Sequence, residues 1–348
     1  MSSRRERLEA ILDARGLDAI VLRDGANLAW YLAGARVHVV AGTPILEVTV
    51  GRGGDELRTS AIEAPRLAAE ELDADAPGVR VLPWWEPLDA PTGGPAGSDL
   101  PRPGEADVAD DLMTARAALG PEELERYRAL CRDSAAAAAA ALRRARPGDS
   151  EFALAGRAAR ELYERGIEPI VMLVAGAERL PLHRHPLPTV AMLGDVAMLV
   201  VNGRRHGLVS AVTRMRAFRP LGAAARARYG ALLEVEAAYL GATRAGARIG
   251  DIVAAGTAAY AEHGFAADEW HAHHQGGPMG YATRDYLAHP GTDDVATAGR
   301  PFGWNPSAGG FKVEDTIVAT DGEPEIVSPD PDWPAVEVAG RQRPDVLA

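Results

Sequence analysis

The chain has 348 residues, of which 47% are hydrophobic, and its formal net charge at pH 7 is −12. This length allows two domains of ordinary size, each with its own apolar core. The acidic balance and the scarcity of basic runs argue against nucleic acid and against an anionic membrane surface as partners, because both require clustered cations.

The cysteine content and the first residues bear on the compartment. Cys131 is the only cysteine, which excludes an internal disulfide and a cysteine-based zinc cluster and is typical of a reducing compartment. The N-terminal residues are charged and amphipathic, unlike a secretory signal. No apolar run reaches the roughly 20 residues that a membrane helix needs. We therefore expect a cytoplasmic protein that does not enter membranes.

The first hundred residues predict a small α/β domain. An amphipathic helix is expected at the start, with an apolar face of Leu8, Ile11 and Leu12 and a terminating Gly16. A short apolar strand, a second helix and a further strand are expected to follow, in residues 18–22, 26–34 and 45–50.

The stretch from residue 88 to residue 107 is crowded with proline and glycine and has no hydrophobic periodicity. Such a composition is typical of a linker or a long surface loop. We therefore predict an N-terminal domain over residues 1–107 and a C-terminal domain over residues 108–348.

The second part of the chain is rich in alanine and indicates long helices. A helix is expected from Pro121, with glutamates in its first turn and arginines in its last, as the helix dipole favours. Two Arg-x-Gly-Asp turns, at 146–149 and 248–251, lie 102 positions apart, and each begins a helix that is followed by a histidine-bearing segment. This pattern predicts an internal duplication, although two ordinary helix N-caps would look the same.

Reactive side chains concentrate in three segments, and the first is AGAERLPLHRHPLPT, which contains His183 and His185. The two prolines that follow disfavour a helix and favour an extended backbone. Alternate side chains of an extended backbone point to the same side, so both histidines are expected on one face.

The second segment is DEWHAHHQGGPMGYATRDY, with Trp270, His271, His273 and His274 near its start. Strand-like alternation would place His271 and His273 on one side. The two glycines after Gln275 allow a close turn of the backbone, as at the wall of a pocket.

The third segment is GRPFGWNPSAGGFKVEDTIVATDG, in which Trp304 and Asn305 precede a turn. Lys312, the only lysine of the chain, and Glu314 are expected on one face of the following strand, with Asp315 on the other. A Lys-x-Glu pair of this kind is more often a solvated ion pair than part of a site.

Together the segments resemble the pita-bread superfamily, which includes creatinase, aminopeptidase P, prolidase and methionine aminopeptidase. The motifs are GLDAIVLRDGANLAWYLAG for the small N-terminal domain, AGAERLPLHRHP for a substrate-binding histidine loop, GDVAMLVVNG with SAVTR for the first metal hairpin, HHQGG for a histidine turn and WNPSAGGFKVEDT for the last hairpin. The resemblance implies an α/β fold: a creatinase-like N-terminal α/β domain, then a pita-bread domain with pseudo-twofold internal duplication.

The metal-dependent members of this superfamily use the ligands Asp, Asp, His, Glu and Glu. The resemblance places the first Asp at Val201 or Asn202, the remaining ligands at Ala211, His274, Asn305 and Glu314, and a further histidine at Tyr281. Only one carboxylate then remains, and two buried divalent cations without counter-charges are very unfavourable. We therefore expect no metal and no other cofactor; a single ion on His274, Glu314 and another histidine would lack the usual number of converging ligands.

The resemblance implies a metal-independent, creatinase-like hydrolase that acts on a carbon–nitrogen bond, in an amide, amidine or guanidino group, of a small molecule or short peptide. In this interpretation His183 is the general acid/base, and Glu314 binds an N–H or cationic group of the substrate and orients His274. The expected substrate-binding residues are His185, Asn202, Trp270, His273, Tyr281, Arg284, Trp304, Asn305 and Lys312.

Two other hypotheses fit the same residues. One is a non-catalytic protein that binds a peptide or small molecule, and the other is a non-hydrolytic enzyme, such as a lyase or cyclase of small-molecule metabolism. The resemblance also implies a homodimer.

Overall fold

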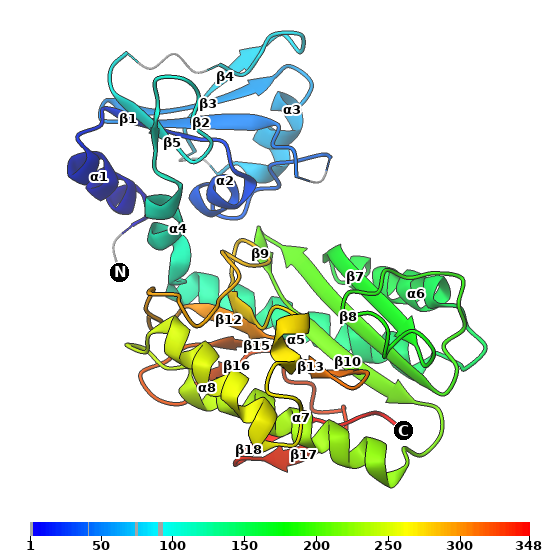
Figure 1. Cartoon of the computed structure of the whole chain (residues 1–348). Helices are drawn as coiled ribbons and strands as arrows, with labels where there is room; N and C mark the ends of the chain where they lie inside the picture. The colour runs from blue at the N-terminus through cyan, green and yellow to red at the C-terminus, as the bar shows by residue number, and fades with distance from the viewer. Residues whose placement is uncertain (1–2, 41, 74–75, 90–92) are drawn as a thin grey trace. The chain divides into compact units, whose positions relative to one another are not determined.

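The computed structural model describes residues 3–40, 42–73, 76–89 and 93–348. The chain divides into two compact units (Figure 1). The first comprises Met1–Ala118 with His206–Leu208, and the second comprises Leu119–Arg205 with Val209–Ala348. Both units contain helices and sheets, which confirms the predicted α/β class.

The first unit is built on a six-stranded sheet in the order β4-β3-β2-β1-β5-β6. The central strand β1 pairs antiparallel with β2 and parallel with β5. The strands are β1 (Ala19–Leu22), β2 (Leu46–Gly51), β3 (Gly54–Ser60), β4 (Gly78–Leu82), β5 (Ala96–Ser98) and β6 (Ala106–Asp107). The helices are α1 (Arg4–Arg15), α2 (Gly25–Tyr31), α3 (Ala64–Arg66), the π-helix η1 (Leu67–Glu71) and α4 (Ala109–Ala117).

Helix α1 ends where the sequence predicts. Ser3 and Glu6 form a reciprocal capping box at its start, and Gly16 ends it in the left-handed conformation with φ 64°. The predicted apolar face is buried, namely Leu8, Ile11 and Leu12.

The predicted linker over residues 88–107 is partly wrong, because its described portion contributes strands β5 and β6 to the sheet. A Cβ atom at Gly97 would lie 2.8 Å from a Leu17 carbon and 2.9 Å from a Val108 carbon. Gly97 is therefore needed for close packing. The composition of the segment, which predicts a linker or surface loop, does not indicate this role.

The first half of the second unit packs two helices on a sheet in the order β10-β8-β7. Helix α5 (Pro121–Arg143) contacts β8 and β10, and α6 (Glu151–Tyr163) contacts β7. Five alanines of α5 are fully buried (Ala135, Ala137, Ala138, Ala139 and Ala141), so the helix approaches the sheet closely. The strands are β7 (Glu168–Gly176), β8 (Val196–Arg205), the short β9 (Leu208–Val209), which pairs with β8, and β10 (Val212–Ala217).

The second half repeats this plan with helices α7 (Ala223–Ala242) and α8 (Ile249–Glu262), which pack against each other (Figure 1). Its sheet has the order β11-β12-β15-β16. The strands are β11 (Gly276–Pro278), β12 (Pro301–Trp304), β15 (Asp315–Val318) and β16 (Glu325–Ile326). A 3-10 helix η2 (Glu269–Ala272) and two hairpins complete it: β13 (Ser307–Ala308) with β14 (Phe311–Lys312), and β17 (Ala335–Val338) with β18 (Arg341–Pro344).

Each half contains an equivalent bridge at the start of its second helix, as the predicted duplication implies. Ser150, at the start of α6, bridges Met192, and Arg248, at the start of α8, bridges Val295. The halves are joined where the backbone N–H of Thr213 on β10 donates to the carbonyl of Glu314, 2.9 Å away, just before β15. This bridge brings the two histidine-bearing segments to one place.

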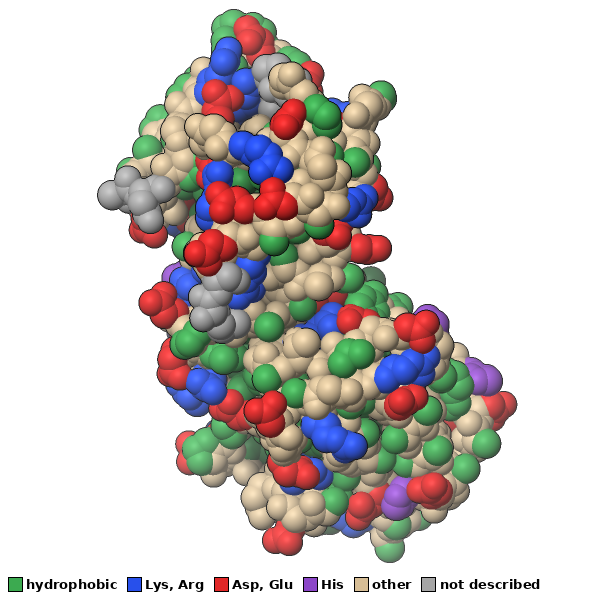
Figure 2. All heavy atoms as spheres, turned by 90° about the vertical axis from the view of Figure 1, so that its left-hand side faces the viewer, with side chains coloured by type: hydrophobic (Ala, Val, Ile, Leu, Met, Phe, Trp, Pro, Cys, Tyr) green, Lys and Arg blue, Asp and Glu red, His purple; other side chains and the backbone are tan. Residues whose placement is uncertain are grey.

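No helix among the described residues combines the length and apolarity needed to span a membrane. Figure 2 shows acidic and basic side chains interspersed over the face that it presents. Exposed charges also form surface ion pairs, such as that of Arg160 on α6 with Glu164 just after it, and such exposed pairs contribute little to stability.

Candidate active site

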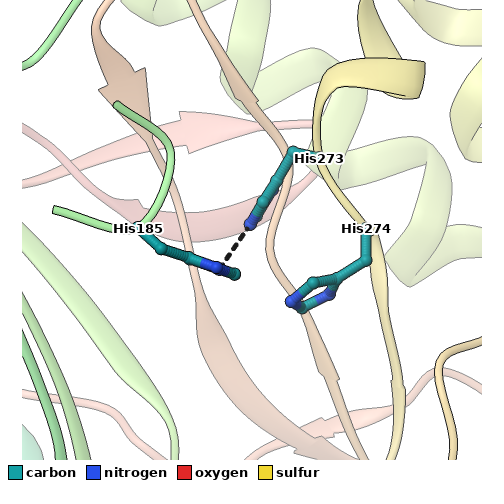
Figure 3. Close-up of side chains that lie close together, drawn as sticks. All are labelled: His185, His273 and His274. Atoms are coloured by element: carbon teal, nitrogen blue, oxygen red, sulfur yellow. Dashed lines mark hydrogen bonds between the residues drawn. The ribbon is translucent and has the colours of Figure 1, made fainter. Parts of the chain in front are cut away.

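Three imidazole rings meet in the second unit (Figure 3). Nε2 of His185, from the loop between β7 and β8, lies 2.9 Å from Nε2 of His273, from the segment between η2 and β11. The ring of His274 lies beside both, with centroid distances of 5.2 Å to His185 and 4.6 Å to His273. Two histidines that the sequence assigns to substrate binding and one that it assigns to catalysis are thus brought together.

The backbone of the second histidine segment departs from the predicted alternation. Residues Glu269–Ala272 form the 3-10 helix η2, and His271 is exposed. Only from His273 onward is the backbone extended, with φ −157° and ψ 137°. The shared face predicted for His271 and His273 is therefore wrong, because a 3-10 turn does not alternate side chains as a strand does.

A buried glutamine, Gln275, holds this segment in place. Its side-chain oxygen accepts hydrogen bonds from the hydroxyls of Tyr239 at 3.2 Å and Tyr260 at 2.9 Å. Its amide nitrogen donates to the carbonyl of His273. The amide thus ties the backbone of the histidines to α7 and α8, a positioning role that the sequence reasoning missed.

Glu314 is held by two donors on opposite oxygens. Nη2 of Arg284 donates to Oε1 over 2.7 Å, and the hydroxyl of Thr213 donates to Oε2 over 3.0 Å. The neighbouring Asp315 faces the other way, where it accepts from Arg214 and Arg343, each over 2.8 Å. The predicted opposite faces of Glu314 and Asp315 are therefore confirmed.

A dinuclear metal centre does not fit these residues. The positions that the resemblance assigns to the two aspartates are buried and apolar at Val201 and Ala211, and the position of the first glutamate is Asn305. The remaining carboxylate, Glu314, already pairs with the guanidinium of Arg284. Two divalent cations at these positions would therefore have a single carboxylate, Glu314, and the guanidinium of Arg284 already pairs with it.

The space around Arg284 is shaped for its guanidinium. A Cβ atom at Gly303 would lie 2.8 Å from Nη2 of Arg284, so only glycine leaves this volume open. Nη1 contacts the sulfur of Met279 at 3.7 Å. Met279 in turn packs with Val209 and Ala211 in a small buried apolar cluster. The guanidinium thus lies against an apolar surface with Glu314 as its charged partner.

Burial and nearby cations keep the three imidazoles neutral. Desolvation by burial and then Lys312 lower the pKa of His185 and, much more strongly, that of His273. Desolvation and then Arg284 lower the pKa of His274 to about 4. All three rings therefore hold lone pairs at neutral pH, so they can accept protons or hydrogen bonds.

The only lysine of the chain lies in this cluster. Lys312 is 3% exposed, and burial lowers the pKa of its amine, an effect that Glu314 opposes and Arg284 reinforces. Burial would raise the pKa of Glu314, but Lys312 and Arg284 outweigh it and hold that pKa below its usual value. Lys312 and Glu314 are thus electrostatically coupled inside the protein, unlike a solvated surface pair.

Two residues that the sequence reasoning missed extend the cluster. The Ser307 hydroxyl lies 3.2 Å from Nδ1 of His273, and Nη1 of Arg184 donates to it over 3.3 Å. Arg184 also forms an ion pair with Glu269 on η2. Ser307 follows Asn305 by two positions, and Arg184 lies between His183 and His185 in the sequence. Only the folded structure shows that these two side chains contact the cluster.

Three other residues that the sequence assigns to the site have the following surroundings. His183 is exposed and lines a small cavity together with Lys312 and Ser307. Tyr281 donates from its hydroxyl to Oε1 of Glu123 on α5, over 2.7 Å. Asn202 is buried on β8.

The two tryptophans pack rather than line an open pocket. Trp304 is fully buried, stacks on Tyr239 with a centroid distance of 5.1 Å, and donates from its ring nitrogen to the hydroxyl of Thr243 over 2.9 Å. Trp270 is half-buried against the core and meets the ring of His271 edge to face at 4.3 Å. The two tryptophans therefore contribute to the packing around the imidazole cluster.

Comparisons with known proteins agree with this architecture. The model of metallopeptidase family M24 matches residues 125–321, more than half of the chain, whereas comparison with curated protein sequences gave no match.

Three solved structures illustrate the similarity. The prolidase from Pyrococcus horikoshii OT3 has 17% identity and a TM-score of 0.80, over 94% of this chain and 98% of that one. The X-Pro aminopeptidase from Thermotoga maritima MSB8 has 15% identity and a TM-score of 0.77, over 94% and 98%. The N-terminal domain of FACT complex subunit SPT16 from Cicer arietinum has 14% identity and a TM-score of 0.68, over 94% and 96%.

At such identities the solved structures establish the fold, which confirms the predicted two-part pita-bread architecture. The residues that match the family model include helices α6 to α8, strands β7 to β15 and the three histidines described above. The chain therefore belongs to metallopeptidase family M24.

Proposed function

We propose that this protein hydrolyses a carbon–nitrogen bond of a small molecule without a dinuclear metal centre, by acid–base catalysis with histidine and glutamate. The observation that carries the proposal is the meeting of His185, His273 and His274 beside Glu314, at a place where Val201, Ala211 and Asn305 stand at the positions of metal-binding carboxylates. The family supports a hydrolase, and two of the similar structures, the prolidase and the X-Pro aminopeptidase, are peptidases by name.

Geometry favours His185 over His183 as the general acid/base. Both side chains are exposed, so a substrate can reach either, but His185 bonds to His273, whereas among the described residues no hydrogen bond joins the side chain of His183 to the three imidazoles. When His185 donates from Nε2 to His273, its Nδ1 keeps a lone pair, and His273 donates from Nδ1 to Ser307. That lone pair takes a proton from water as the water oxygen attacks the substrate carbon.

The same proton then completes the reaction. His185 returns it to the departing nitrogen as the carbon–nitrogen bond breaks, so the net reaction consumes one water and leaves the imidazole unchanged. The lowered pKa of His185, caused first by burial and then by Lys312, keeps the ring in the base form needed for the first step. Glu314 remains ionised and orients the site through Arg284 and Thr213.

The test is turnover of a panel of N-acyl, amidino and guanidino compounds by the full chain, followed by release of amine or urea. His185→Ala should lower turnover by about 10²–10⁴-fold, and His183→Ala should lower it much less. The exposed His263 provides the matched control His263→Ala, which should leave turnover unchanged. Dialysis against a chelator should leave the rate unchanged. Turnover that persists in His185→Ala, or that disappears with the chelator, would contradict the mechanism.

A second candidate is a non-catalytic binding protein. The replaced carboxylate positions favour it, as does the similarity to the FACT complex subunit, whose name describes a component of a complex and not a peptidase. In that case compounds of the panel bind without being converted, and His185→Ala changes affinity only.

A further inference from the structure

Lys312 is a buried cation without a partner among the described residues. The residue is 3% exposed, and within the described part of the chain no hydrogen bond or ion pair involves its amine. The other cations of the second unit that are buried or nearly so are paired: Arg284 with Glu314, Arg214 with Asp315, Arg300 with Asp294, and Arg343 with Glu236 and Asp315. A buried ammonium is unfavourable unless a counter-charge meets it.

The amine belongs to a small cavity. Lys312 lines this cavity together with His183, Arg184 and Ser307, and Ser307 stands opposite Lys312 in the register of β13 and β14. Arg184 and Ser307 also hydrogen-bond to each other. Ser307 also contacts His273, so the cavity adjoins the histidine cluster.

The charges around Lys312 leave one positive charge uncompensated. The groups that act on it are Glu314, Arg284 and Arg184, and Arg184 is paired with Glu269. Three cations thus face two carboxylates. The imidazoles do not change this sum, because burial and the same cations keep them neutral.

Two further polar atoms are unmatched beside the cluster. The side-chain oxygen of Asn305 and Nδ1 of His274 are both buried, and neither has a hydrogen-bond partner among the described residues. An amide oxygen can only accept a hydrogen bond. A ligand that satisfies the site therefore brings an N–H group as well as a negative charge.

The net charge of the ligand distinguishes among the ligand classes that could bind at this site. A divalent metal on the three imidazoles would add two positive charges to an environment that is already positive. A guanidino acid is a zwitterion, so it would leave the excess charge in place. An N-acyl amino acid carries one carboxylate, an amide N–H and a carbon–nitrogen bond, and its net charge of about −1 matches the site.

We propose that the substrate is an N-acylated amino acid whose free carboxylate pairs with Lys312 and whose amide N–H donates to the side-chain oxygen of Asn305. Arg284 is not the anchor, because its guanidinium is committed to Glu314. The proposal rests on the proposed function for the bond that is cleaved, but the carboxylate subsite stands on the unmatched groups alone.

The test is calorimetric binding to the full chain, with N-acetylglycine, its neutral analogue N-acetylglycinamide, and the zwitterion guanidinoacetate as probes. N-acetylglycine should bind at least about tenfold more tightly than either other compound, the loss expected when one buried charged contact is missing. The Lys312→Met substitution should weaken the binding of N-acetylglycine by a similar factor. Arg160→Met removes an exposed arginine on α6 and should change nothing.

Equal affinity for N-acetylglycine and its amide, or full affinity in folded Lys312→Met, overturns the proposal. Lys312→Arg, which retains the charge, provides a second variant if Lys312→Met does not fold; it should bind N-acetylglycine more tightly than N-acetylglycinamide. Binding of N-acetylglycine without turnover would support the carboxylate subsite and contradict the proposed hydrolase activity. Turnover of neutral amides in preference to N-acyl amino acids would support the hydrolase activity and contradict the carboxylate subsite.

Discussion

Nη2 of Arg284 lies 2.7 Å from Oε1 of Glu314, and both side chains are largely buried. The resemblance assigns Glu314 to a metal-binding position, and in this protein a tethered guanidinium supplies the positive charge beside it. Gly303 leaves the volume that the guanidinium needs. The electrostatics of the site are therefore set by the chain's own side chains.

Removing one member of this pair should destabilise the protein strongly. Arg284→Met leaves Glu314 as a buried carboxylate without its main partner, so we expect the free energy of unfolding to fall by about 3–5 kcal/mol. The double variant Arg284→Met/Glu314→Gln should recover a large part of this loss. The measurement is urea denaturation of the unmodified protein, Arg284→Met, Glu314→Gln and the double variant, and additive losses would show that the pair is not coupled.

The metal content should differ from that of a dinuclear enzyme. Protein loaded with Mn²⁺ or Co²⁺ and then dialysed should retain fewer than two equivalents per chain, because only one carboxylate is present and Arg284 shares it. Elemental analysis gives the stoichiometry. Two tightly held equivalents would contradict both the expected absence of a dinuclear centre and the metal-free mechanism.

Stability should decrease on acidification. The pKa of His274 is lowered to about 4 from 6.5, first by burial and then by Arg284, so between these values the unfolded chain binds more protons than the folded one. The free energy of unfolding therefore rises with pH across this window; the contribution is complete above about pH 6.5 and is lost as pH falls toward 4.

The size of this effect can be isolated with a variant. His274→Gln should make the slope of stability against pH shallower by less than about 1.4 kcal/mol per pH unit, since the ring is partly exposed. The exposed His263 provides the control His263→Gln. Denaturation curves between pH 4 and 7 give the slopes, and unchanged slopes in His274→Gln would refute the assignment.

The turn after the histidines should depend on glycine. Gly276 has φ 104°, and a Cβ atom there would lie 2.0 Å from the carbonyl oxygen of Gly303. We expect Gly276→Ala to lower the free energy of unfolding by more than about 2 kcal/mol, from strain and steric clash together. Gly264→Ala is the matched control, with φ 82° and no atom within 4 Å, and should cost about 1 kcal/mol. Thermal unfolding that ranks the two variants equally would show that the clash is relieved.

Much of the site was predictable from residue types in order along the chain. The pattern of GDVAMLVVNG, HHQGG and FKVEDT predicted the hairpins and the histidine turn, and the absence of aspartate at Val201 and Ala211 could be read directly. The caps of α1 were predictable because they depend on residues three or four positions apart. The linker was misjudged where Gly97 packs against residues far away in the sequence.

The sequence by itself determined the family architecture, the loss of carboxylates and the single lysine, because these depend on residue identity and local spacing. Only the tertiary structure decided that His185 and not His183 joins His273, 88 positions away, and that Arg284 pairs with Glu314 across 30 positions. It also decided that Lys312 is buried without a partner among the described residues. The physical reason is that contacts between distant segments depend on how the two halves of the second unit pack, and no local periodicity encodes that packing.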